Sequence, residues 1–132
     1  MAKMIQLKNS NNEKIYPRGI VDVLLNEPLQ ASNSPNTLVE TTLLKKYTNY
    51  DIIACRVSLG KNGTEGIWCL LFPKLSQPLQ EQFSTRIYSD NYFYGGKIIL
   101  FNNTKVAFTI QHQSGWSYNA IYLNEVVGIK IT

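Results

Sequence analysis

The chain has 132 residues, of which 44% are hydrophobic, and its 13 basic and 9 acidic side chains leave a net charge of +4. This length and composition predict one folded domain with a core of its own, and they exclude a wholly disordered protein. The positive charge is spread along the chain, with only Lys45 and Lys46 adjacent, which excludes the basic stripe typical of a nucleic-acid surface. No apolar run is long enough for a signal peptide or a membrane span, so we expect a protein that is made in a cytoplasm and does not insert into a membrane.

The first residues predict short extended segments. Residues 4–8 and 14–16 flank a turn-rich stretch at 9–13, and they form either a small hairpin or two strand stubs. Such a unit buries too little apolar area to be stable alone. Residues 19–27 carry apolar side chains at helical spacing and predict a short helix that ends before Pro28.

A polar stretch at residues 30–37 is the best boundary in the chain. We therefore predict two parts, an N-terminal arm at residues 1–35 and the domain proper at residues 36–132. The arm holds apolar residues without enough chain to bury them, which indicates that it has a task of its own. Directly after the boundary, residues 38–44 predict a strand.

The clearest element is a β-hairpin whose arms are residues 51–59 and 67–72, joined by a polar, glycine-rich loop at 60–66. The first arm alternates apolar and polar residues, which is typical of a half-buried strand. The second arm is apolar on both faces, so it must be covered on both by a second sheet or by a neighbouring subunit. Trp68, inside this arm, is predicted to lie in the core or in an interface.

The two cysteines lie in the two arms of this hairpin. A turn centred near Gly63 would place Cys55 opposite Leu71 and Cys69 opposite Val57, so that the cysteines are diagonal neighbours. We favour two buried thiols that act as small apolar residues over a disulfide bridge.

The rest of the chain favours an all-β fold. Residues 73–82 predict a long connection, residues 83–88 a strand, and residues 89–96 a loop that is aromatic where loops are usually polar. Three strands then follow at the short spacing expected of a sandwich or barrel: residues 97–101, residues 105–111 after a turn at Asn102 and Asn103, and residues 120–132, with a bend near Glu125 or Gly128. We therefore predict an antiparallel, jelly-roll-like β-sandwich preceded by the arm and its short helix.

The sequence contains little that could carry catalysis. The single histidine, His112, continues the inward face of the strand before it, and we interpret it as a strand-end residue with a local hydrogen bond. Asp90 with Asp51 or Glu81 could form a glycosidase pair, but nothing in the sequence brings these carboxylates together. One histidine, two strand cysteines and scattered acids do not make a typical zinc site. We therefore predict no enzymatic activity, no metal and no cofactor.

Binding fits the sequence better than catalysis, because two predicted loops are rich in aromatic residues. Rigid aromatic surfaces suit sugar rings or protein partners, and neighbouring polar side chains can hydrogen-bond sugar hydroxyls. The alternative is a structural role, in which these rings pack beneath their own loops or against another subunit of the same protein. The predicted ligand-binding residues are Tyr92, Phe93, Tyr94, Trp116, Tyr118, Asp90 and Gln113.

Three segments resemble the fibre proteins of tailed bacteriophages. Residues 5–17 resemble the "LKD..GN.IYP"-like segment that precedes the body of many such fibres. Residues 48–53 resemble the "sNYd.I" strand entry of the small β-sandwich domains at the ends of tail and head fibres. Residues 122–131 are similar to the "I.GIK" endings of those domains.

This resemblance implies a virion protein, a short homotrimeric fibre that is made in the host cytoplasm. Its N-terminal arm would attach to other virion proteins and trimerise, and its sandwich would point outward and display the aromatic loops to host-surface polysaccharide. A closed three-fold assembly would also bury the exposed apolar residues of the arm and of the hairpin. Two alternatives stay open: a monomeric carbohydrate-binding module, and a capsid decoration protein without receptor activity.

Overall fold

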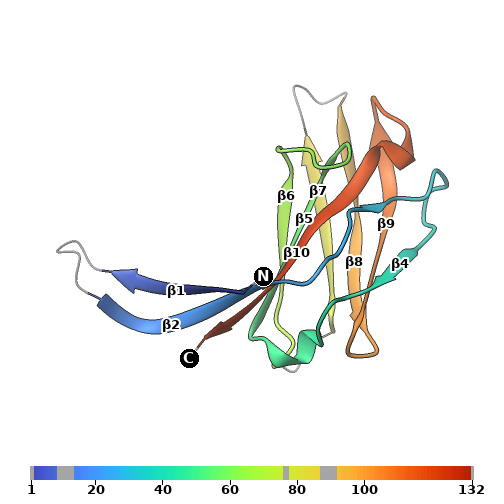
Figure 1. Cartoon of the computed structure of the whole chain (residues 1–132). Coiled ribbons are helices and arrows are strands. Elements are labelled where there is room, and N and C mark those ends of the chain that lie inside the picture. Colours follow the sequence, from blue (N-terminus) through green and yellow to red (C-terminus); the bar gives the residue numbers. More distant parts are fainter. Residues whose placement is uncertain (1, 9–13, 76–77, 87–91, 132) are drawn as a thin grey trace.

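The computed structural model describes residues 2–8, 14–75, 78–86 and 92–131, and it has the predicted all-β fold, in which two antiparallel sheets pack as a sandwich (Figure 1). Sheet A has the strand order β1-β2-β10-β5-β6, with the short β3 also paired to β10, and sheet B has the order β4-β9-β8-β7. The strands are β1 (Ala2–Lys8), β2 (Lys14–Val23), β3 (Leu29–Gln30), β4 (Val39–Thr42), β5 (Ile52–Leu59), β6 (Ile67–Leu71), β7 (Gln80–Arg86), β8 (Phe93–Phe101), β9 (Lys105–Ser114) and β10 (Ile121–Ile131), with short 3-10 helices η1 (Tyr47–Asn49) and η2 (Tyr118–Ala120). In these described ranges, no helix has the length and apolar character needed to span a bilayer.

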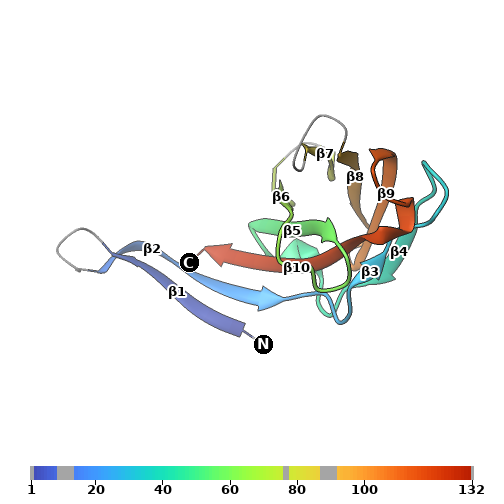
Figure 2. The same ribbon diagram turned by 90° about the horizontal axis from the view of Figure 1, so that it is seen from above.

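The two N-terminal strands form a hairpin, the first of the two predicted arrangements. β1 pairs with β2, and β2 pairs in turn with β10 at the centre of sheet A. The predicted turn at residues 9–13 lies outside the described residues. Residues 2–8 and 14–18, which we call the ribbon, extend sideways beyond the sandwich, and no strand of sheet B faces them (Figures 1 and 2).

The predicted helix at residues 19–27 is wrong, because this segment completes β2 and then bends toward β3. Val21 and Val23 lie opposite residues of β10, whereas Leu24 is fully buried on the other side. The apolar residues of this segment fit a helical spacing and a strand alternation about equally well, and the hydrogen bonds that β10 offers decide between them. Part of the predicted arm therefore lies in the sandwich, with Leu24, Leu25 and Ala31 in its core.

The central hairpin is confirmed, with β5 and β6 antiparallel, but its register differs from the prediction. Cys55 lies directly opposite Cys69, not diagonal to it. The turn is shifted by one residue because Asn62 takes a left-handed conformation (φ 61°) and its N–H donates a 2.8 Å hydrogen bond to Asn124 Oδ1 of β10. Both thiols are free and buried, as predicted.

The C-terminal strands are confirmed with corrections of their bounds, since the strand predicted at residues 105–111 continues to Ser114. Asn102 and Asn103 both have positive φ (53° and 64°), a conformation that asparagine tolerates, in the tight turn between β8 and β9. The bend predicted near Glu125 is a register shift between Leu123 and Glu125 in the pairing of β10 with β5. The loop predicted at residues 89–96 is wrong in its second half, because residues 93–96 belong to β8, which begins at Phe93.

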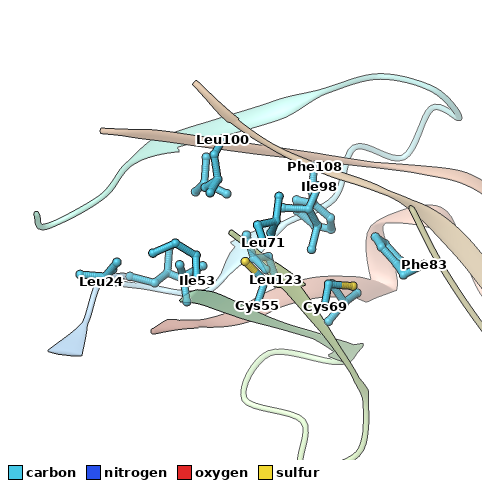
Figure 3. Packing of buried hydrophobic residues seen from close by; sticks show 14 of the residues in the cluster. Leu24, Ile53, Cys55, Cys69, Leu71, Phe83, Ile98, Leu100, Phe108 and Leu123 are labelled. Atoms are coloured by element: carbon cyan, nitrogen blue, oxygen red, sulfur yellow. The ribbon is translucent and has the colours of Figure 1, made fainter. Parts of the chain in front are cut away.

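The core lies between the two sheets. Ile53 from β5 and Leu123 from β10 lie on the sheet A side of the core and Phe108 from β9 on the sheet B side, and all three are fully buried (Figure 3). Side chains from adjacent positions point outward, as the two-residue period of a strand requires. The outward-facing surfaces of the two sheets are therefore the surfaces available for function.

Candidate ligand-binding site

An aromatic cluster lies at the end of the sandwich where β8 begins and β9 ends. The ring of Trp116 packs 5.8 Å from Tyr92 and 6.1 Å from Tyr94, measured between centroids. The contact with Tyr94 is edge-to-face, at an interplanar angle of 76°, the geometry that aromatic pairs prefer. Trp116 is therefore supported on one side by the core and on the other by an exposed tyrosine.

The loop that carries Trp116 is built to hold it. The backbone N–H of Trp116 donates a 3.1 Å hydrogen bond to Gln113 Oε1. Gly115 has φ +97°, which disfavours other residues, and a Cβ at this position would overlap the ring of Tyr92. Gln113 and Gly115 thus position the rings of Trp116 and Tyr92. Gln113 does so by holding the backbone of the loop.

A β-bulge in β9 turns His112 away from the core. Gly95 pairs with His112 and Gly96 pairs with Ile110, so Gln111 is the extra residue. The prediction that His112 continues the inward face is therefore wrong: its side chain is exposed and lies over Gly95, where the absence of a Cβ leaves room for the imidazole.

The exposed His112 forms one wall of an open recess. The recess has a volume of about 600 Å³ and is lined by Ser84 and Thr85 of β7, Phe93 of β8 and His112 of β9. The rings of Phe93 and His112 lie 5.7 Å apart. Two hydroxyls, an imidazole and an aromatic ring offer hydrogen-bond donors and acceptors beside an apolar surface, and no charged side chain is among these lining residues.

The structure brings some of the predicted binding residues together and separates others. Tyr92 is exposed, and Phe93 and Trp116 are half-buried, all at this end of the sandwich. Tyr118 in η2 is half-buried and packs against the core. Tyr94 lies inside the core, fully buried, with its hydroxyl 3.3 Å from the carbonyl oxygen of Val57.

Asp90 lies outside the described residues, so its place at the site stays a prediction. Ser84, Thr85 and His112 were not among the predicted binding residues. The adjacent glycines Gly95 and Gly96 were the available signal, because glycine inside a strand often marks a bulge or a close backbone approach.

The acidic and metal-binding groups that the structure describes give no second site. Asp51 binds Lys74 Nζ at 3.1 Å through Oδ1 and accepts the N–H of Ile131 at 2.6 Å through Oδ2. The hydrogen bond from Ile131 and the contact with Lys74 lower the pKa of this carboxyl, the opposite of the shift that a general acid needs. Across the described ranges, no three His, Cys, Asp or Glu side chains gather as metal ligands.

Comparison with models of known protein families found no match, and comparison with curated protein sequences found no significant match either.

Proposed function

We propose that this chain is a structural protein of a bacteriophage virion, a short trimeric fibre that binds host-surface glycan through the recess beside the aromatic cluster. The protein would act without catalysis or a cofactor, and it would be made in the host cytoplasm before joining the particle. The resemblance of residues 5–17, 48–53 and 122–131 to fibre proteins motivates this proposal.

The separation of the two ends of the molecule is the observation that best supports it. The ribbon leaves the sandwich on one side near the beginning of β5, whereas the recess lies at the opposite end, where β7 and β9 end and β8 begins (Figure 1). A fibre needs such a division, with one end held by the particle and the other directed outward. The ribbon would supply the attachment to other virion proteins.

The chemistry of the recess suits a sugar. A pyranose ring offers a C–H face that packs on an aromatic ring and hydroxyls at its edge. Phe93 supplies the aromatic surface, and Ser84, Thr85 and His112 supply polar groups around it. Tyr92, exposed next to Trp116, extends the surface for a second sugar unit of a polysaccharide.

The direct test is binding of the full-length protein to an array of bacterial surface glycans. Phe93→Ala should weaken the binding of any glycan found by at least about tenfold, since one aromatic contact contributes about 1.4 kcal/mol or more. Phe101→Ala is the matched control, because Phe101 is also half-buried and points outward from β8 at the far end of the strand. Absence of any bound glycan, or equal binding by the two variants, would contradict the proposal.

A further inference from the structure

The recess beside the aromatic cluster continues along β8 into a second cavity. This cavity has a volume of about 260 Å³ and shares Ser84 and His112 with the recess. Its other lining residues are Gln82 and Phe83 of β7, Gly96 of β8 and Gln111 of β9. We call this cavity the trough. It extends from the recess in the direction away from Tyr92, toward the middle of sheet B.

Gly95 allows His112 to stand between the two cavities. Ser84, Gly95 and His112 lie opposite one another in one row across β7, β8 and β9. A Cβ on Gly95 would lie 2.5 Å from the imidazole, so the glycine is what lets the ring lean over β8. Ser84 and His112 therefore mark the junction at which the recess ends and the trough begins, and a ligand that crosses the junction can contact both.

The bulge in β9 gives the trough an amide on its second wall. In a regular strand, two adjacent side chains point to opposite faces of the sheet. The extra residue in β9 changes this, and Gln111 and His112 both line the trough. Gln82 lies on the opposite wall, on β7, and is exposed, whereas Gln111 is half-buried. The trough therefore has one primary amide on each side.

The groups along the trough suit the hydroxyls of a sugar. A primary amide donates hydrogen bonds through its nitrogen and accepts them through its oxygen, and a sugar hydroxyl also does both. Within the described part of the chain, no side-chain hydrogen bond engages the amide of Gln82 or of Gln111. Both amides are therefore available to a ligand, together with the hydroxyl of Ser84 and the imidazole of His112.

We propose that the trough is a second sugar subsite, so that the ligand is a chain of at least two sugar units that runs along β8. One unit packs on Phe93 in the recess, and the next unit lies between Gln82 and Gln111. The inference rests on the proposed glycan binding. It adds the direction of the chain and the polar residues that hold its second unit.

The dependence of affinity on chain length tests the second subsite. The probe is the glycan that the full-length protein binds most tightly on the array, cut by partial hydrolysis into fragments of one and two sugar units. The two-unit fragment should bind at least about tenfold more tightly than the one-unit fragment in calorimetric titration, because the second unit adds several hydrogen bonds.

Methionine variants locate the source of this gain in affinity. Gln82→Met and Gln111→Met each remove an amide and keep an unbranched side chain of similar length. Each should reduce the ratio between the two affinities by about threefold or more. Gln80→Met is the matched control, because Gln80 is also exposed on β7 but lines neither the recess nor the trough, and it should leave the ratio unchanged. Thermal unfolding establishes that each variant is folded.

The failures of the trough and of the proposed function are distinguishable. Equal affinities of the unmodified protein for the two fragments would overturn the second subsite and leave the recess intact. An undiminished ratio in both Gln82→Met and Gln111→Met would overturn it too, and a loss of the ratio in Tyr92→Ala would then place the second unit beside Trp116. Absence of any bound glycan would overturn the proposed glycan binding, and this inference with it.

Discussion

The hydroxyl of Tyr50 donates a 2.6 Å hydrogen bond to Oδ2 of Asp22 inside the sandwich. This bond joins β2 to the segment that precedes β5. Lys45 Nζ lies 3.5 Å from the same oxygen, and the ring of Tyr50 lies against Gly128 of β10. One tyrosine thus connects three segments of sheet A at the point where the ribbon leaves the sandwich.

Tyr50→Phe should lower the free energy of unfolding by about 2 kcal/mol at neutral pH. The substitution removes one hydrogen bond to a buried carboxylate and leaves that charge less well compensated. Chemical denaturation of the two proteins measures the difference. A value near zero would mean that the bond contributes nothing net to folding.

The destabilisation by Tyr50→Phe should also depend on pH. The hydrogen bond from Tyr50 holds the pKa of Asp22 below its usual 3.8, against burial, which raises it. A carboxyl with a lowered folded-state pKa contributes stability that is fully present above its unfolded pKa and is lost as the pH falls through the folded one. The gap between the two proteins should therefore be constant from pH 5 to pH 7 and close below about pH 4. A difference in stability that widens in acid would contradict this pH dependence.

Gly128→Ala should destabilise the protein by about 1–3 kcal/mol, the usual range for overpacking a filled core. A Cβ at this position would overlap the Tyr50 ring, which its bond to Asp22 holds in place. The thermal midpoint should fall, and the near-ultraviolet circular dichroism of the tyrosines should change. Wild-type values for both would show that the ring can move freely.

Neither cysteine should react with a thiol reagent in the folded protein. Burial raises the pKa of Cys69 to about 11 and that of Cys55 still further, so the reactive thiolate is scarce near pH 8. Ellman's reagent should detect two thiols per chain in guanidinium chloride and close to none in buffer. Rapid reaction in buffer would indicate that the hairpin opens readily.

Tyr94 should behave as a core residue in mutagenesis. Tyr94→Ala should cost about 3–5 kcal/mol of stability because it empties a fully buried site, whereas Tyr94→Phe should cost only about 1 kcal/mol, the value of one neutral hydrogen bond. Denaturant unfolding separates the two. Full stability of Tyr94→Ala combined with loss of glycan binding would instead make Tyr94 part of the binding surface.

Local patterns in the sequence predicted the strands that pair with their neighbours in the chain. The turn at Asn102 and Asn103 and the hairpin around Asn62 follow from residues that tolerate positive φ. Alternation of apolar and polar residues then located the first arm of this hairpin, because one face of that strand lies in the core.

Long-range pairing explains what the sequence did not reveal. Residues 19–23 form a strand between two partners, β1 and β10, and β10 follows them by more than a hundred residues. The bulge at Gln111 reverses which side His112 faces, and no alternation pattern encodes an inserted residue. The recess was therefore missed, and Tyr94 was assigned to a loop.

The central place of β10 in sheet A determines when this protein can fold. β10 is the last of the described strands to be synthesised, and it lies between β2 and β5. Until it has left the ribosome, β2 and the central hairpin have no common partner, and each presents an unpaired strand edge to other nascent chains. Slow synthesis late in translation would prolong this aggregation-prone interval and should lower the yield of soluble protein.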